Sequence, residues 1–191
     1  MRPALPVLLL VLLASAVHLL AEGKAEPGPQ GRQAPAPSLP VVDGVITPGE
    51  YDFTRDSGEL SFFEKKTGDT LYLAVQGMTT GWVGVGVGAL EMNGATIFMG
   101  YVDDAGRVVF KPQAGEPGHT HEDTSDAVLK TVRSYAMKES GGKTTLEVAL
   151  VASAYITQGQ AELQAIYAIG PDDSFTEYHL DRDFTTVPLK Q

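Results

Sequence analysis

Short runs of β-prone residues, each ended by a glycine- or aspartate-rich turn, recur along most of this chain. Runs of about five to eight residues, separated by such turns, are typical of antiparallel sandwiches and barrels. Two segments, 125–132 and 151–155, could each form one helical turn at most, and strands do not alternate with helices as in an α/β fold. The sequence therefore predicts an all-β sandwich or barrel with strands at residues 71–75, 82–87, 95–102, 107–111, 131–138, 144–151, 162–169 and 175–187.

The N-terminus has the residue order of a secretory signal. Arg2 precedes a leucine-rich apolar run and then small residues, and cleavage is expected after Ala16 or after Ala21. An uncleaved anchor helix is the alternative, because about 20 apolar residues can span a bilayer. We predict a signal peptide at residues 1–21 and an extracytoplasmic protein, periplasmic or secreted, that has no stable membrane insertion once the signal is removed.

A proline- and glycine-rich segment follows the signal. Residues 22–40 contain almost nothing that could join a core, so we expect a disordered linker there. The folded domain is predicted to span residues 41–189, a usual size for one domain.

The composition excludes several kinds of function. The chain has no cysteine, so disulfides, thiolate metal sites and cysteine nucleophiles are impossible. Its formal net charge of −10 argues against nucleic-acid binding, because no basic stripe could neutralise phosphates. The sequence also lacks a nucleophile elbow, a zinc-protease helix and a phosphate-binding loop. We therefore expect a carrier or binding module rather than an enzyme.

Glycine alternates with valine in the strand predicted over residues 82–87. Since alternate residues of a strand share a face, Trp82, Gly84, Gly86 and Gly88 lie on one face and three valines on the other. Glycine inside a strand often marks the close approach of another part of the protein or of a ligand. The pattern thus predicts either a tight structural contact or a ligand-binding face.

Once the signal is set aside, only three histidines remain, and a loop methionine is a further candidate ligand. Met92 lies between polar neighbours in the loop after the glycine face, and His179 lies near the start of the last predicted strand. His119 and His121 form a His-x-His pair in an acidic loop, and such a pair can hold zinc or copper. The alternative for this loop is a solvated segment that binds metal only adventitiously.

Four segments carry a resemblance to DOMON domains, a family of extracytoplasmic β-sandwiches with haem b-binding and sugar-binding members. They are residues 42–51, similar to the family's opening strand; 81–95, with the Gly-Trp strand and Met92; 97–104, an apolar strand ending in Asp-Asp; and 178–182, a His-to-Arg segment before the last strand. The resemblance covers most of the predicted domain and implies an antiparallel, immunoglobulin-like β-sandwich.

The resemblance also implies a cofactor. In the haem-binding branch, which includes the cytochrome domain of cellobiose dehydrogenase, a methionine and a histidine ligate haem b. Carried over to this sequence, the ligands of a noncovalent haem would be Met92 and His179, with Trp82, Gly84 and Gly86 beside it. Iron with both axial positions filled suits electron transfer, and methionine ligation raises its potential. A separate redox partner protein is then expected.

Two other functions remain open. One is a non-redox module for a sugar or another small ligand, for which Tyr51, Phe53, Phe62 and Tyr72 are available, although we expect these four in the core. The other is a metal-binding protein that uses the His119 and His121 loop.

Overall fold

The computed structural model describes residues 39–190 except Ser125. The predicted signal, residues 1–21, and all but the last two residues of the predicted linker lie outside the described residues. In the part of the chain that is described, no helix has the length and hydropathy needed to cross a membrane.

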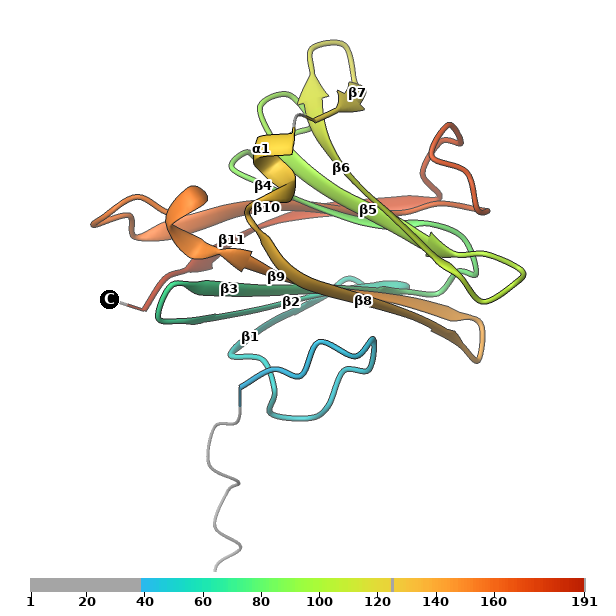
Figure 1. Ribbon diagram of the computed structural model, residues 1–191, viewed down its shortest axis with the longest axis horizontal. Helices are drawn as coiled ribbons and strands as arrows, with labels where there is room; N and C mark the ends of the chain where they lie inside the picture. Colours follow the sequence, from blue (N-terminus) through green and yellow to red (C-terminus); the bar gives the residue numbers. More distant parts are fainter. Residues whose placement is uncertain (1–38, 125, 191) are drawn as a thin grey trace, which may run out of the picture. The chain divides into compact units, whose positions relative to one another are not determined.

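The described strands form two antiparallel sheets that pack against each other (Figure 1). The five-stranded sheet has the order β1 (Phe53–Asp56), β2 (Leu60–Thr67), β3 (Thr70–Gly77), β9 (Lys143–Val151), β8 (Val132–Ser140). The six-stranded sheet has the order β11 (Asp181–Pro188), β10 (Glu162–Ile169), β4 (Val83–Val87), β5 (Thr96–Val102), β6 (Val108–Glu116), β7 (Thr120–Asp123). This architecture confirms the predicted all-β fold and decides for the sandwich over the barrel.

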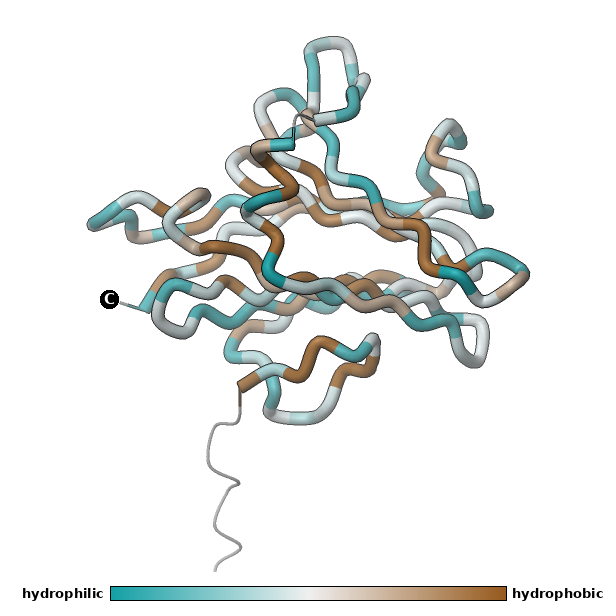
Figure 2. Tube along the Cα trace, in the orientation of Figure 1, coloured by the Kyte–Doolittle hydropathy of each residue, from teal (hydrophilic) through white to brown (hydrophobic). Residues whose placement is uncertain are grey.

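The core lies between the sheets, because alternate residues of each strand point inward. Phe62 of β2 stacks on Tyr167 of β10 with ring centroids 5.2 Å apart, and the three valines of β4 are buried in the same cluster. Apolar residues, brown in Figure 2, follow the strands, whereas the turns are mostly hydrophilic. The valine face of β4 is therefore core, as the alternation predicted.

Residues 42–51, expected to form an opening strand, form turns instead. Gly44 has a φ of 82°, which an extended strand does not allow. The fully buried Glu147 of β9 accepts hydrogen bonds from the backbone N–H groups of Asp43 (2.9 Å) and Gly44 (2.6 Å) and from the Tyr51 hydroxyl (2.6 Å). One buried carboxylate thus holds this segment on the five-stranded sheet in place of a strand ladder.

Other elements differ from the prediction in detail. The last strand starts at Asp181 rather than at residue 175, because the loop before it folds back and places Phe175 on Tyr101, with ring centroids 5.0 Å apart. Strands β1 and β2 were not predicted, and β7 forms where a loop was expected. The two predicted helical turns are confirmed as α1 (Asp126–Leu129) and the 3-10 turn η1 (Ala152–Ala154).

Candidate functional site

The six-stranded sheet has a second face that points away from the core, here called the outer face. The alternation in β4 places Gly84 and Gly86 on it, because Val83, Val85 and Val87 occupy the core side. The strand ladders bring Met99 of β5 opposite Gly84, and Ile166 of β10 opposite Gly86. The glycine face predicted from the sequence is therefore the middle of the outer face.

Neighbouring side chains fill the gaps that these glycines leave. A Cβ at Gly84 would lie 3.1 Å from Met99 Cγ, and a Cβ at Gly86 would lie 2.7 Å from Ile166 Cγ1. In this structure the two glycines admit Met99 and Ile166, which fits the tight structural contact that the sequence left open beside the ligand-binding face.

An apolar cluster, here called the outer-face cluster, lies over this region. Its buried members are Trp82, Ala95, Ile97 and Met99, and partly buried side chains packed against it include Met92, Tyr101, Ile166 and Phe175. Two loops contribute to it from outside the strands. Met92 comes from the loop between β4 and β5, and Phe175 comes from the loop between β10 and β11.

The β4–β5 loop is held against β6. Gly94 N–H donates to the Gly115 carbonyl at 3.1 Å, and Gly115 N–H donates to the Ala95 carbonyl at 2.9 Å. A Cβ at Gly115 would lie 1.6 Å from the Met92 carbonyl oxygen and 3.2 Å from Met92 Cγ. Met92 thus occupies the place that a side chain at residue 115 would fill. The close approach of the two backbones, together with these hydrogen bonds, holds Met92 in position.

The β10–β11 loop is anchored beside Trp82. Gly170 N–H donates to the Trp82 carbonyl at 2.8 Å, and Trp82 N–H donates to the Asp172 carbonyl at 3.1 Å. His179 is half-buried near the end of this loop. Burial lowers the pKa of His179 below its ordinary value, and the positive charge of Arg182 lowers it further. This shift favours the neutral imidazole, the form that ligates a metal.

The two predicted ligands lie at opposite ends of β4. The loop with Met92 follows the last residue of this strand, whereas the loop with His179 is bonded to Trp82, just before its first residue (Figure 1). At about 3.3 Å per residue, the strand separates the two loops by roughly 17 Å. The structure thus gathers Trp82, Gly84, Gly86 and Met92 on one face, while His179 borders that face from the far end.

Some buried polar atoms have no hydrogen-bond partner within the described residues: Trp82 Nε1, Gln113 Oε1, His121 Nδ1 and Asp173 Oδ1. The Trp82 nitrogen is a donor inside the outer-face cluster, and leaving such a buried group unpaired costs free energy. No sequence pattern pointed to these atoms, because an unmet partner is a property of packing. They mark the outer face and its flanking loops as a place where a ligand could supply hydrogen bonds.

The two other histidines, His119 and His121, differ in exposure. His119 is exposed, with a φ of 62°, in the turn between β6 and β7, whereas His121 is half-buried on β7. His121 pairs with Gly115 in the ladder, so it stands beside Met92, a neighbour that sequence reasoning missed. Burial lowers the pKa of His121. In the described ranges, no three histidine, aspartate or glutamate side chains group to hold a metal, so the His-x-His pair has no third ligand there.

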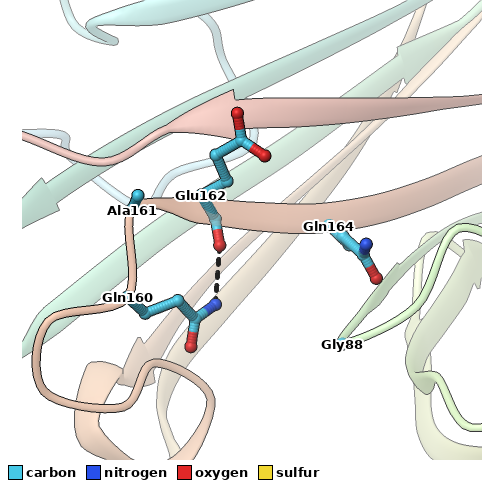
Figure 3. A pocket seen from close by; sticks show the side chains of 5 residues that line it. All are labelled: Gly88, Gln160, Ala161, Glu162 and Gln164. Carbon is cyan, nitrogen blue, oxygen red and sulfur yellow. Dashed lines mark hydrogen bonds between the residues drawn. The ribbon is translucent and has the colours of Figure 1, made fainter.

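The aromatic residues considered for sugar binding do not form an exposed platform. Phe62 is fully buried and Phe53 packs against the same core, as expected. Tyr51 is bonded to Glu147, and Tyr72 is half-buried. A pocket of about 340 Å³ lies at the end of β4 and is lined by Gly88, Gln160, Ala161, Glu162 and Gln164 (Figure 3).

No protein-family model matches the chain, and no curated protein sequence matches it. Solved structures similar to it include the cytochrome b domain of pyranose dehydrogenase from Coprinopsis cinerea, with a TM-score of 0.51 and 12% identity over 68% of this chain and 76% of that one. Another is the cytochrome domain of Myriococcum thermophilum cellobiose dehydrogenase, with a TM-score of 0.49 and 9% identity over 72% and 81% of the two chains. The chain thus shares the fold of a cytochrome b domain, which confirms at the level of fold its resemblance to the DOMON β-sandwiches.

Proposed function

We propose that this protein is a haem b-binding module that passes single electrons outside the cytoplasm. Met92 and His179 are the candidate iron ligands that the family resemblance implies. Since their loops lie roughly 17 Å apart along β4, one iron would bind both only if the two loops closed toward each other. One observation carries the proposal. The loop with Met92 and the loop with His179 reach the outer-face cluster from opposite ends of β4, and each packs an apolar side chain on it. A potential ligand thus stands at either end of one apolar surface. The shared fold with a cytochrome b domain supports the same function.

The residues present suit haem in their chemistry. A thioether and a neutral imidazole are ligands that iron accepts in cytochromes, and an apolar surrounding keeps water from the metal. Because the glycine gaps are filled, the group would lie over Met99 and Ile166 rather than between the glycines. Haem b held there would supply reversible one-electron chemistry at its iron.

Each of the two candidate ligands is held in its own loop. The backbone hydrogen bonds between Gly115 and the β4–β5 loop hold Met92, and the Phe175–Tyr101 contact holds the loop that ends in His179. Burial and the charge of Arg182 lower the pKa of His179, which favours the unprotonated imidazole. Since the chain has no cysteine, the haem would be bound without thioether links.

The N-terminal sequence places this chemistry outside the cytoplasm. A signal over residues 1–21 would export the chain, so the haem would be acquired after export. The electron donor and acceptor would then be separate proteins.

Absorbance spectra test the proposal. We expect the chain, expressed with its signal and purified from the exported fraction, to show a Soret band and sharp α and β bands after reduction with dithionite. Met92→Ala and His179→Ala should each lose the low-spin spectrum, whereas His119→Ala, which removes an exposed imidazole, should keep it. A protein that stays colourless after haemin titration would overturn the proposal. Loss of the low-spin spectrum in His121→Ala but not in His179→Ala would move the histidine ligand to β7.

A second candidate function rests on the pocket at the end of β4. Gln164 offers its side-chain amide there to a hydroxylated ligand such as a sugar, whereas the Gln160 amide is bonded to the Glu162 carbonyl at 2.7 Å (Figure 3). Calorimetric titration with mono- and disaccharides tests it. Binding that Gln164→Ala abolishes, in a protein without haem, would favour this function over electron transfer.

A further inference from the structure

Three large apolar side chains are strongly exposed along one short stretch of the chain, residues 178–184. Tyr178 is 73% exposed, Leu180 is 61% exposed and Phe184 is 58% exposed. Together they are called the β11 patch here. Phe184 stands opposite Ile166, which packs on the outer-face cluster, so the patch continues that apolar surface to the sheet edge. Exposed apolar side chains gathered in this way are typical of interaction surfaces.

We infer that the β11 patch is the docking surface for a basic redox protein. The inference rests on the proposed electron-transfer function and names the surface and the chemistry of the partner that this function requires. Tyrosine, phenylalanine and leucine would supply the apolar contact at the centre of the interface.

The edge of β11 is closed to pairing with another strand. Arg182 N–H donates to Asp181 Oδ1 and Phe184 N–H donates to Asp183 Oδ1, both at 2.8 Å. Backbone N–H groups that are already bonded to side chains cannot join a new ladder. Docking on the patch therefore uses its side chains and not strand addition.

The charges around the patch select a cationic partner. Residues 171–182 contain a single basic residue, Arg182, against four acidic residues, Asp172, Asp173, Glu177 and Asp181. The next acidic residue, Asp183, pairs with Arg55 of β1 at 3.9 Å and is not counted with them. A second copy of this chain would bring the same acidic groups to the interface, and like charges placed face to face oppose association. A partner with a basic rim would be attracted and steered toward the patch.

The location of the patch suits electron transfer. His179 lies between Tyr178 and Leu180 in the sequence, so a protein docked there would lie next to the proposed iron ligand. Electron tunnelling falls steeply with distance, and contact at this position keeps the path short.

Binding to a basic c-type cytochrome, used as the probe, tests the inference without requiring haem in this chain. We expect salt-dependent binding of the whole exported protein to the immobilised probe. Leu180→Ser combined with Phe184→Ser should weaken this binding by about tenfold, the loss typical of apolar anchors. Val41→Ser is the matched control, because Val41 is 62% exposed on the N-terminal segment that lies against the other sheet.

Glu177→Lys should weaken binding more than Glu139→Lys, which makes the same charge change on β8.

The outcomes separate this inference from the proposed function. A colourless protein that binds the probe through the patch would overturn the haem proposal but not the docking surface. A haem-loaded protein whose patch variants bind the probe as tightly as the wild type does would overturn the docking surface alone. Absence of wild-type binding, or a dimer in sedimentation that Leu180→Ser dissociates, would also overturn it.

Discussion

The indole of Trp82 packs so closely on Gly170 that a Cβ at residue 170 would lie 1.8 Å from Nε1. The same two residues are joined by the backbone hydrogen bond from Gly170 N–H to the Trp82 carbonyl. The loop that carries His179 therefore starts at a position that has no space for a side chain. The outer-face cluster and this loop are thus joined through the contact between Trp82 and Gly170.

Gly170→Ala should destabilise the fold, because the new methyl group must displace the indole. We expect a loss of about 1–3 kcal/mol in the free energy of unfolding, the range for overpacked cores, measured by urea titration. Gly84→Ala is the control, since its nearest neighbour is the flexible Met99 side chain at 3.1 Å. Equal losses in the two variants would contradict the tight Trp82–Gly170 contact.

Gly115→Ala should displace the β4–β5 loop, because its Cβ would meet the Met92 carbonyl oxygen. Amide exchange at Gly94 and Gly115 should become faster as their hydrogen bonds weaken. If Met92 ligates haem, the dissociation constant should rise by roughly 10- to 100-fold, as it does when groups that orient a metal ligand are removed. Glu116→Ala, one residue further along β6, should leave both measurements unchanged, and unaltered exchange in Gly115→Ala would refute the contact.

Glu64 should make the protein less stable as pH rises toward neutrality. Burial, together with the nearby negative charge of Asp52, raises the pKa of Glu64 to about 7. A folded-state pKa above the unfolded value gives stability that is present below about pH 4.5 and lost as pH rises through 7. Glu64→Gln should match the wild type near pH 4 and exceed it at pH 8 by up to about 3 kcal/mol, at about 1.4 kcal/mol per pKa unit.

Urea titrations between pH 4 and 8 measure this difference. Glu59→Gln, which makes the same substitution at an exposed position before β2, is the control. A Glu64→Gln curve parallel to the wild-type curve would show that Glu64 ionises like an exposed carboxyl.

Glu147→Ala should release the segment over residues 41–51. The substitution leaves two backbone N–H groups, of Asp43 and Gly44, and the Tyr51 hydroxyl without their acceptor. Each unpaired buried donor costs about 1–3 kcal/mol, which opening of the segment to water would relieve. Hydrogen exchange at Asp43 and Gly44 should therefore lose its protection, whereas Glu139→Ala on exposed β8 should preserve it. Retained protection in the Glu147 variant would mean that other contacts hold the segment.

Local patterns were enough to predict much of the fold. The valine–glycine alternation of β4 predicted correctly which residues face the core, because the side-chain period of a strand is a property of the backbone itself. The strand predicted for residues 42–51 does not form, and the reason is non-local. The apolar residues of this segment resemble a strand, but Glu147, about a hundred residues away, binds its N–H groups and replaces a ladder.

The sequence by itself determined most of the β-strands, the two faces of β4, the absence of thiol chemistry and the methionine and histidine candidates for a cofactor or metal ligand. Only the tertiary structure decided that Met99 and Ile166 fill the glycine gaps, that Met92 stands over Gly115 beside His121, and that His179 borders the outer face from the far end of β4. The physical reason is register. Which side chains meet across a sheet depends on how strands distant in sequence are aligned, and no local pattern contains that alignment.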